Sequence, residues 1–223
     1  MSASLFLSAM IKFLVGLVLT GGLLFLPAGT LAFPGGLRLM AVLFVPMFAA
    51  GIVMMVKNPG LLASRLQAKE SEQEQKWVIR LSGLMCVTGF VLAGLDFRFS
   101  WSPLPVWFSR TAGGIFLVCY GLYGEVLREN TYLSRTVRVQ EGQTVVDTGL
   151  YGVVRHPMYA ATVVMFLMIP LTLGSWISLI PFLGYPFVIG LRIRNEEQVL
   201  SRELAGYDEY RKKVRFRLTP YIW

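Results

Sequence analysis

The sequence predicts an all-α, polytopic integral membrane protein with about six transmembrane helices and a cytoplasmic C-terminal helical tail. Apolar residues make up 55% of the 223 residues, charged residues only 15%, and the mean hydropathy is +0.58. A soluble domain of this length rarely has such a composition. The apolar residues also form runs long enough to cross a hydrocarbon core about 30 Å thick, which takes roughly 20 helical residues.

The predicted spans follow these apolar runs along the chain. The first run is preceded by Lys12 and followed by small residues, as a secretory signal is, but its length and the further spans after it favour a retained helix. The last two runs are separated only by a short turn around Gly174 and Ser175, so they are expected to form a helical hairpin. The six predicted spans are residues 13–33, 37–56, 78–95, 111–127, 153–173 and 176–191.

The distribution of basic residues predicts the orientation. Of the 21 Lys and Arg residues, all but Arg38, Arg98 and Arg110 fall on one side of the six spans. Since cytoplasmic loops carry the excess of positive charge, both termini and the large polar segments are expected in the cytoplasm. The net charge of +8 follows the membrane boundary, which favours anionic lipid headgroups over nucleic acid as partners. The sequence leaves the oligomeric state open.

The chain divides into two parts of different character. Residues 1–127 hold four mainly structural helices that could line a substrate, and their polar segment 57–80 has the mixed charge of a solvated helix. Residues 128–223 hold a loop of about 25 residues with extended-looking patterns at 136–140 and 144–148, and loops of this length are usually functional. No metal site or disulfide framework is expected, because the chain has one histidine and two cysteines, both in predicted spans.

Polar residues gather where the hairpin begins and ends, a place we call the hairpin mouth. Residues 155–159 begin the hairpin and residues 192–197 follow it, so positions about forty apart are brought together. Ionisable groups at a membrane boundary tend to be paired or functional. Arg192 and Glu196 are four apart and therefore share one helix face, where they could also form a plain ion pair.

The residues at the start of the hairpin suit a ligand site. Pro157 is expected at the first helical position, which leaves neighbouring main-chain amides available to a ligand. His156, the single histidine, would by itself be a structural hydrogen-bonding group. Tyr151 and Tyr159 are ordinary interfacial residues taken alone, but their ring faces could also stack on a purine or attract a sulfonium cation.

Three blocks in the second part carry a family resemblance. They are residues 149–159 (GLYGVVRHPMY), residues 192–200 (RIRNEEQVL) and residues 206–210 (GYDEY), followed by Pro220. Together they resemble the isoprenylcysteine carboxyl methyltransferase family, which is related to the phospholipid methyltransferases. The resemblance covers about residues 140–220, and the first half of the chain matches only in hydropathy.

The resemblance implies S-adenosylmethionine-dependent methyl transfer to the carboxylate of a lipid-like, isoprenylcysteine-type substrate, either a lipophilic small molecule or a lipidated one. Arg192 would orient that carboxylate, Glu197 is a second candidate catalytic residue, and Glu196 would bind the ammonium group of the cofactor. An ionised carboxylate needs no general base. The residues implied for the cofactor site are Gln140, Gln143, Thr144, Val145, Val146, Tyr151, His156, Pro157, Met158, Tyr159 and Glu196.

Three other readings remain open. A lipid amine as acceptor would need a proton acceptor, for which Glu197 or His156 are the candidates. A membrane reductase using a nicotinamide cofactor is the more distant enzyme alternative, because sterol reductases are similar in their last helices. A non-enzymatic scaffold or transporter would spread polar residues along the middle of its spans, whereas here they cluster at the hairpin mouth.

Overall fold

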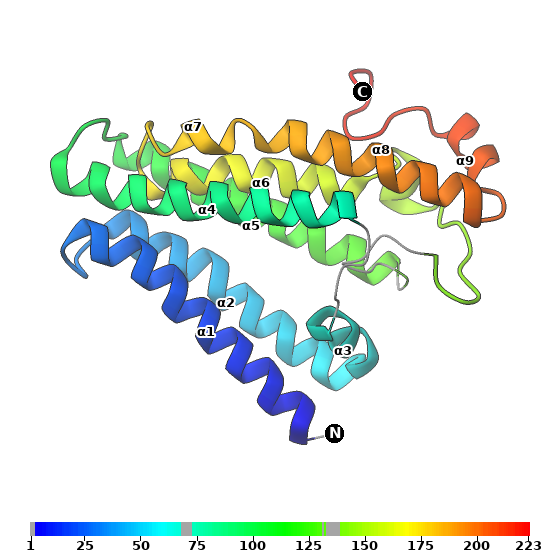
Figure 1. Cartoon of the computed structure of the whole chain (residues 1–223), viewed down its shortest axis with the longest axis horizontal. Coiled ribbons are helices and arrows are strands. Elements are labelled where there is room, and N and C mark those ends of the chain that lie inside the picture. The colour runs from blue at the N-terminus through cyan, green and yellow to red at the C-terminus, as the bar shows by residue number, and fades with distance from the viewer. Residues whose placement is uncertain (1–2, 68–72, 131, 133–138) are drawn as a thin grey trace.

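Helices account for the regular structure throughout the parts of the chain that the computed structural model describes, which are residues 3–67, 73–130, 132 and 139–223 (Figure 1). No strand occurs in these ranges, which confirms the predicted all-α fold. The elements are α1 (Ala3–Ala28), α2 (Pro34–Lys57), α3 (Pro59–Gln67), α4 (Gln73–Phe99), α5 (Val106–Glu129), η1 (Gly149–Gly152), α6 (Pro157–Leu173), α7 (Leu179–Phe182), α8 (Tyr185–Glu203) and α9 (Tyr207–Lys213).

The long N-terminal helices have the length and surface of membrane spans. Among the described residues, three helices are long and apolar enough to cross a bilayer: Ser4–Ala28, Pro34–Lys57 and Lys76–Phe99. Their outer faces are strongly exposed, as at Leu26 (81%) and Val56 (72%), although both side chains are apolar. Large exposed apolar surfaces of this kind mark contact with a membrane. The chain is therefore an integral membrane protein, with helices at each of the six predicted positions.

The predicted last span is interrupted and then prolonged. Residues 176–191 were expected to form one helix, but α7 ends at Phe182 and α8 begins at Tyr185 with Pro186 in its first turn. Proline suits that position, because its missing amide donor would have no partner there. The helix α8 then continues to Glu203, beyond the apolar run, because Arg, Glu, Gln and Leu are strong helix formers.

Close helix contacts are made at small residues. Gly35 at the start of α2 lies so near the end of α6 that an added Cβ would be 1.9 Å from the carbonyl oxygen of Leu173. Gly94 in α4 also lies close to α1, where an added Cβ would be 2.6 Å from the carbonyl oxygen of Leu24. Small residues permit such approaches between membrane helices. The core beside these contacts contains Leu24, Leu39, Phe90, Phe116 and Phe182.

The two ends of the helix bundle differ in chemistry. At one end, Arg38 Nη1 and the Ser109 hydroxyl donate to the carbonyl of Thr172, at 3.0 and 2.7 Å, which joins the starts of α2 and α5 to the end of α6. There the chain turns at Gly174, whose φ of 88° is left-handed and readily adopted by glycine. Both chain termini lie toward the opposite end, as does the hairpin mouth (Figure 1).

The orientation of these ends is testable by cysteine labelling. We expect Phe99→Cys, at an exposed position near the Arg38 end, to react with an impermeant reagent applied to intact cells, whereas Glu141→Cys reacts only after lysis. Both variants would be made after replacing Cys86 and Cys119. Gly35 is unsuitable as a labelling position because its Cβ would collide with α6. Labelling of Glu141→Cys from outside would invert the topology.

Candidate active site at the hairpin mouth

The start of α6 is held in place by the C-terminal tail. The amides of Arg155 and His156 donate to the carbonyls of Phe216 and Arg217, both at 2.9 Å. Pro157 is the first residue of α6, as predicted. The expectation that the neighbouring amides stay available to a ligand is wrong for these two, because the C-terminal tail folds back and its carbonyls accept hydrogen bonds from both amides.

A buried ion cluster joins α6, α8 and the tail. Glu197 is its centre: Oε1 accepts from Arg155 Nε at 2.8 Å and lies 3.3 Å from His156 Nε2, and Oε2 accepts from Arg217 Nε at 3.0 Å. The Glu197 side chain is only 5% exposed. Burial would raise the pKa of Glu197, but the hydrogen bonds from its three neighbours outweigh that effect and keep the pKa well below its ordinary value. Glu197 therefore stays ionised.

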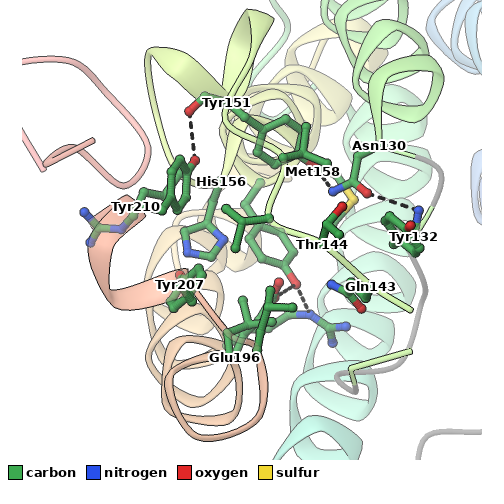
Figure 2. A pocket seen from close by; sticks show the side chains of 17 residues that line it. Asn130, Tyr132, Gln143, Thr144, Tyr151, His156, Met158, Glu196, Tyr207 and Tyr210 are labelled. Carbon is green, nitrogen blue, oxygen red and sulfur yellow. Dashed lines mark hydrogen bonds between the residues drawn. The ribbon is translucent and has the colours of Figure 1, made fainter. Parts of the chain in front are cut away.

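Beside this cluster lies a cavity of about 100 Å³ that opens to solvent, which we call the tyrosine-rich cavity. Its walls come from the loop before η1, the start of α6, the inner face of α8 and the helix α9 (Figure 2). The structure brings most of the sequence-predicted site residues to this cavity. Those are Gln143, Thr144, Val145, Val146, Tyr151, His156, Met158, Tyr159, Arg192 and Glu196.

Three residues named from the sequence do not line the cavity. Gln140 acts inside the loop, where its amide donates to Gln143 Oε1 at 2.9 Å and its side chain bonds the carbonyl of Tyr132. Pro157 contributes only the start of α6. Glu197 points into the ion cluster. The cofactor-binding roles of Gln140 and Pro157 and the catalytic role of Glu197 stay predictions. The contacts of these three residues hold the loop, the start of α6 and the tail in place.

A hydroxyl links the two charged residues of α8. Tyr159 donates to Glu196 Oε2 at 2.5 Å and accepts from Arg192 Nε at 2.8 Å (Figure 2). The Arg192 guanidinium also lies 5.7 Å from the centre of the Tyr159 ring. Arg192 and Glu196 do share one face of α8, as their spacing predicts, and Tyr159 from α6 fixes both side chains at the cavity wall.

Tyrosines line much of the cavity, and one of them has an unused hydroxyl. Tyr151 accepts from Asn130 Nδ2 at 3.1 Å, and the Tyr210 hydroxyl donates to the Tyr151 carbonyl at 2.8 Å. The Tyr207 hydroxyl is buried and has no hydrogen-bond partner among the described residues. Burial, followed by the charges of the two nearby glutamates, raises the pKa of Tyr207, so the hydroxyl stays a proton donor. A buried donor without a partner is unusual and suits a ligand.

Sequence reasoning missed several residues of the wall. Tyr207 and Tyr210 belong to the third motif block, which could have suggested them, but their contact with the cavity depends on how the tail returns. Arg155 and Leu200 lie inside the first and second blocks, whereas nothing in the local pattern singled out Asn130, Tyr132 and Leu204. The lining residues not named from the sequence as site residues are Asn130, Tyr132, Arg155, Leu200, Leu204, Tyr207 and Tyr210.

The arrangement suits an organic ligand with charges of both signs. Glu196 offers a carboxylate, the tyrosine rings offer faces that attract cations, and Arg192 offers a planar donor for a carboxylate. The described residues contain no cluster of three or more His, Cys, Asp or Glu side chains that could hold a metal ion.

Comparison with known proteins points to the same part of the chain. Residues 110–205 match the model of the phospholipid methyltransferase family. A curated relative is the mouse Delta(14)-sterol reductase TM7SF2, which is 29% identical over 92 residues, 40% of this chain. The aligned segment covers only 22% of that reductase, so the two proteins share a limited region. The matched segment includes the loop before η1, α6 and α8, which carry most of the cavity wall, whereas α5 contributes no lining residue.

Proposed function

We propose that this membrane protein is an S-adenosylmethionine-dependent methyltransferase that acts on a lipid-like acid. The observation that carries the proposal is the cavity at the hairpin mouth. Ten residues implied by the motif resemblance line it, among them Glu196 and Arg192, and most of its wall falls within the segment that matches the methyltransferase family.

The residues of the cavity fit this cofactor. Glu196 is suited to the cofactor's ammonium group, because a charged hydrogen bond inside a protein is strong. The faces of Tyr151 and Tyr159 would attract the sulfonium cation, and the unused hydroxyl of Tyr207 would donate to a polar atom of the ligand. When bound, the cofactor supplies an electrophilic methyl group.

The position of Arg192 supports a role at the methyl acceptor. Arg192 lines the tyrosine-rich cavity and also a second cavity, of about 300 Å³, on the other side of Tyr159. The lining of that second cavity combines polar side chains with apolar ones: Arg65, Ser82, Tyr123, Thr162 and Tyr185 are polar, and Val78, Ile79, Met158 and Ile189 are apolar. A guanidinium between the two cavities could hold a carboxylate in one orientation toward the methyl group. We therefore prefer an acid of the isoprenylcysteine type as acceptor.

An amine acceptor fits the structure less well. An ammonium must lose a proton before it can attack, and the candidates for accepting it are Glu197 and His156. Both Glu197 oxygens are already in contact with basic side chains, and the pKa of this carboxyl lies below its ordinary value. A carboxylate so strongly stabilised is a weak base. A carboxylate acceptor avoids this difficulty.

Cofactor binding separates the proposal from a reductase, the activity named for the mouse relative. We expect purified protein in detergent to bind S-adenosylmethionine and its demethylated product in the micromolar range, measured by calorimetry, and to show no response to a reduced nicotinamide dinucleotide. The same protein, given radiolabelled S-adenosylmethionine and a panel of lipid acids and amines, should label an acid. Binding of the dinucleotide alone would replace the methyltransferase proposal with the reductase.

A conservative variant tests the cofactor's place in the cavity. Tyr207→Phe removes only the buried hydroxyl that lacks a partner, so the fold should be unaffected. We expect its affinity for S-adenosylmethionine to fall about two- to tenfold, the scale of one hydrogen bond. Unchanged affinity in calorimetry would place the ligand away from Tyr207.

A further inference from the structure

A groove runs along the outside of α8, between that helix and α4, and Arg192 lines both this groove and the candidate site. We call this groove the α4–α8 groove, and it has a volume of about 700 Å³. Leu84 and Val188 line it toward the middle of the bundle, and Trp77, Arg80 and Arg194 line it toward the hairpin mouth. The helices α4 and α8 lie side by side along this stretch (Figure 1).

The groove changes from apolar to basic along its length. On α8, Val188 and Leu191 come first, and Arg194 follows about one helical turn later, roughly 5 Å nearer the mouth. On α4, which runs antiparallel to α8, the apolar Leu84 likewise lies deeper in the bundle and the basic Arg80 lies nearer the mouth. An apolar inner part below a basic outer part matches a lipid, whose chains lie deeper in the bilayer than its headgroup.

An unsatisfied donor lies between the apolar and the basic part. Asn195 lines the groove, and its Nδ2 is buried with no hydrogen-bond partner among the described residues. A buried amide donor without a partner costs free energy, which an oxygen of a ligand in the groove would recover. Ester and phosphate oxygens of a phospholipid are acceptors of this kind.

The basic end of the groove continues into a hollow of about 540 Å³. Arg194 and Gln198 line both spaces, and Arg202, Arg211 and Arg217 complete the basic wall of the hollow. The one carboxylate in its lining is Glu197, whose oxygens already face Arg155, His156 and Arg217. Arg211 is paired with Asp208, so Arg194 and Arg202 give the hollow its surplus of positive charge for an anionic ligand.

We propose that the α4–α8 groove and this hollow together bind one phospholipid with an anionic headgroup. Its chains would lie on the apolar stretch, a glycerol-ester or phosphate oxygen would accept from Asn195 Nδ2, and its headgroup would lie near Arg194 and Arg202. Arg192 also lines the inner part of the groove, so this lipid would lie next to the site proposed for the methyl acceptor. Its headgroup end contacts the face of α8 that carries Arg194 and Arg202, whereas Glu196 and Leu200 face the tyrosine-rich cavity.

Trp77 in the groove provides a direct readout. A variant that keeps Trp77 but has Phe at positions 101, 107, 176 and 223 would be mixed with brominated phosphatidylglycerol or with brominated phosphatidylcholine of the same chains, and the fluorescence followed. We expect phosphatidylglycerol to quench at a several-fold lower mole fraction than phosphatidylcholine. Each of Arg194→Gln and Arg202→Gln should weaken that preference by up to about fivefold, the scale of one basic residue near an anionic surface.

Matched controls make the result specific. Arg98→Gln removes an arginine at the opposite end of α4 and should leave the preference unchanged. Soluble glycerol phosphate should not displace the quenching lipid, because it lacks the chains. Equal quenching by both lipids, or a preference that survives Arg194→Gln and Arg202→Gln together, would overturn the proposal. No cofactor is present in this experiment, so its result is independent of the methyltransferase assay.

Discussion

Replacing Arg192 by alanine should reduce methyl transfer by about 10²-fold or more while leaving S-adenosylmethionine binding nearly intact. The reason is geometric: Arg192 lies between the two cavities, bound to the Tyr159 hydroxyl at 2.8 Å, where it can fix the direction of an acceptor carboxylate. Loss of a positioning contact typically costs a reaction this much. The measurement is turnover with a lipid acid at saturating cofactor, beside calorimetry with cofactor alone.

Two further variants separate charge from orientation at this position. Arg192→Lys keeps the positive charge next to Tyr159 but loses the planar pair of donors, so activity should stay low. Glu196→Gln should instead weaken cofactor binding by about ten- to a hundredfold, because a charged partner of an ammonium is worth roughly 1.5–3 kcal/mol. Full activity of Arg192→Lys would mean that Arg192 and Glu196 serve the structure only.

Replacing Glu197 by alanine should cause the largest loss of stability. Glu197 is the shared partner of Arg155, His156 and Arg217, and its removal would leave the nearly buried Arg155 without its carboxylate. Breaking a buried ion pair on one side costs about 3–5 kcal/mol. We expect the midpoint of thermal unfolding in detergent to fall by on the order of 10 °C.

A nearby acidic residue on the same helix is the matched control. Glu203 is exposed at the end of α8, and Glu203→Gln should leave the unfolding midpoint within about 2 °C of the parent, as surface substitutions usually do. A similar midpoint for Glu197→Ala and the parent would show that the cluster does not hold the tail. The catalytic role predicted for Glu197 would be favoured if the variant kept its stability and lost only turnover.

The same cluster predicts how stability depends on pH. The pKa of Glu197 is lower in the folded protein than in the unfolded chain, so folding favours the ionised form. Its contribution is complete at neutral pH and is lost as the pH falls below about 4.3, the ordinary value for glutamate, toward the lower folded pKa. Unfolding midpoints measured across this range should fall less steeply for Glu197→Gln than for the parent.

Much of the fold could be predicted from the sequence because it depends on local hydropathy. Five of the six predicted apolar runs each coincide with one helix, and Gly174 ends α6 in the left-handed conformation that a short hairpin turn requires. The break before Tyr185 and the extension of α8 to Glu203 were not predicted. Hydropathy reports which residues suit lipid, whereas helix ends also depend on proline position and on the helix propensity of polar residues.

Spacing and motif predicted which residues belong to the candidate site, but they did not predict which of these residues face the cavity and which face the tail. The turn at Gly174 alone places residues 155–159 beside residues 192–197, so the sequence by itself determined where chemistry would gather. Only the tertiary structure decided that Glu196 faces the cavity while its neighbour Glu197 faces the tail, because adjacent residues on a helix point about 100° apart. The tail's return, which uses the amides of Arg155 and His156 and presents Tyr207, depends on contacts between residues about sixty apart, which no local pattern encodes.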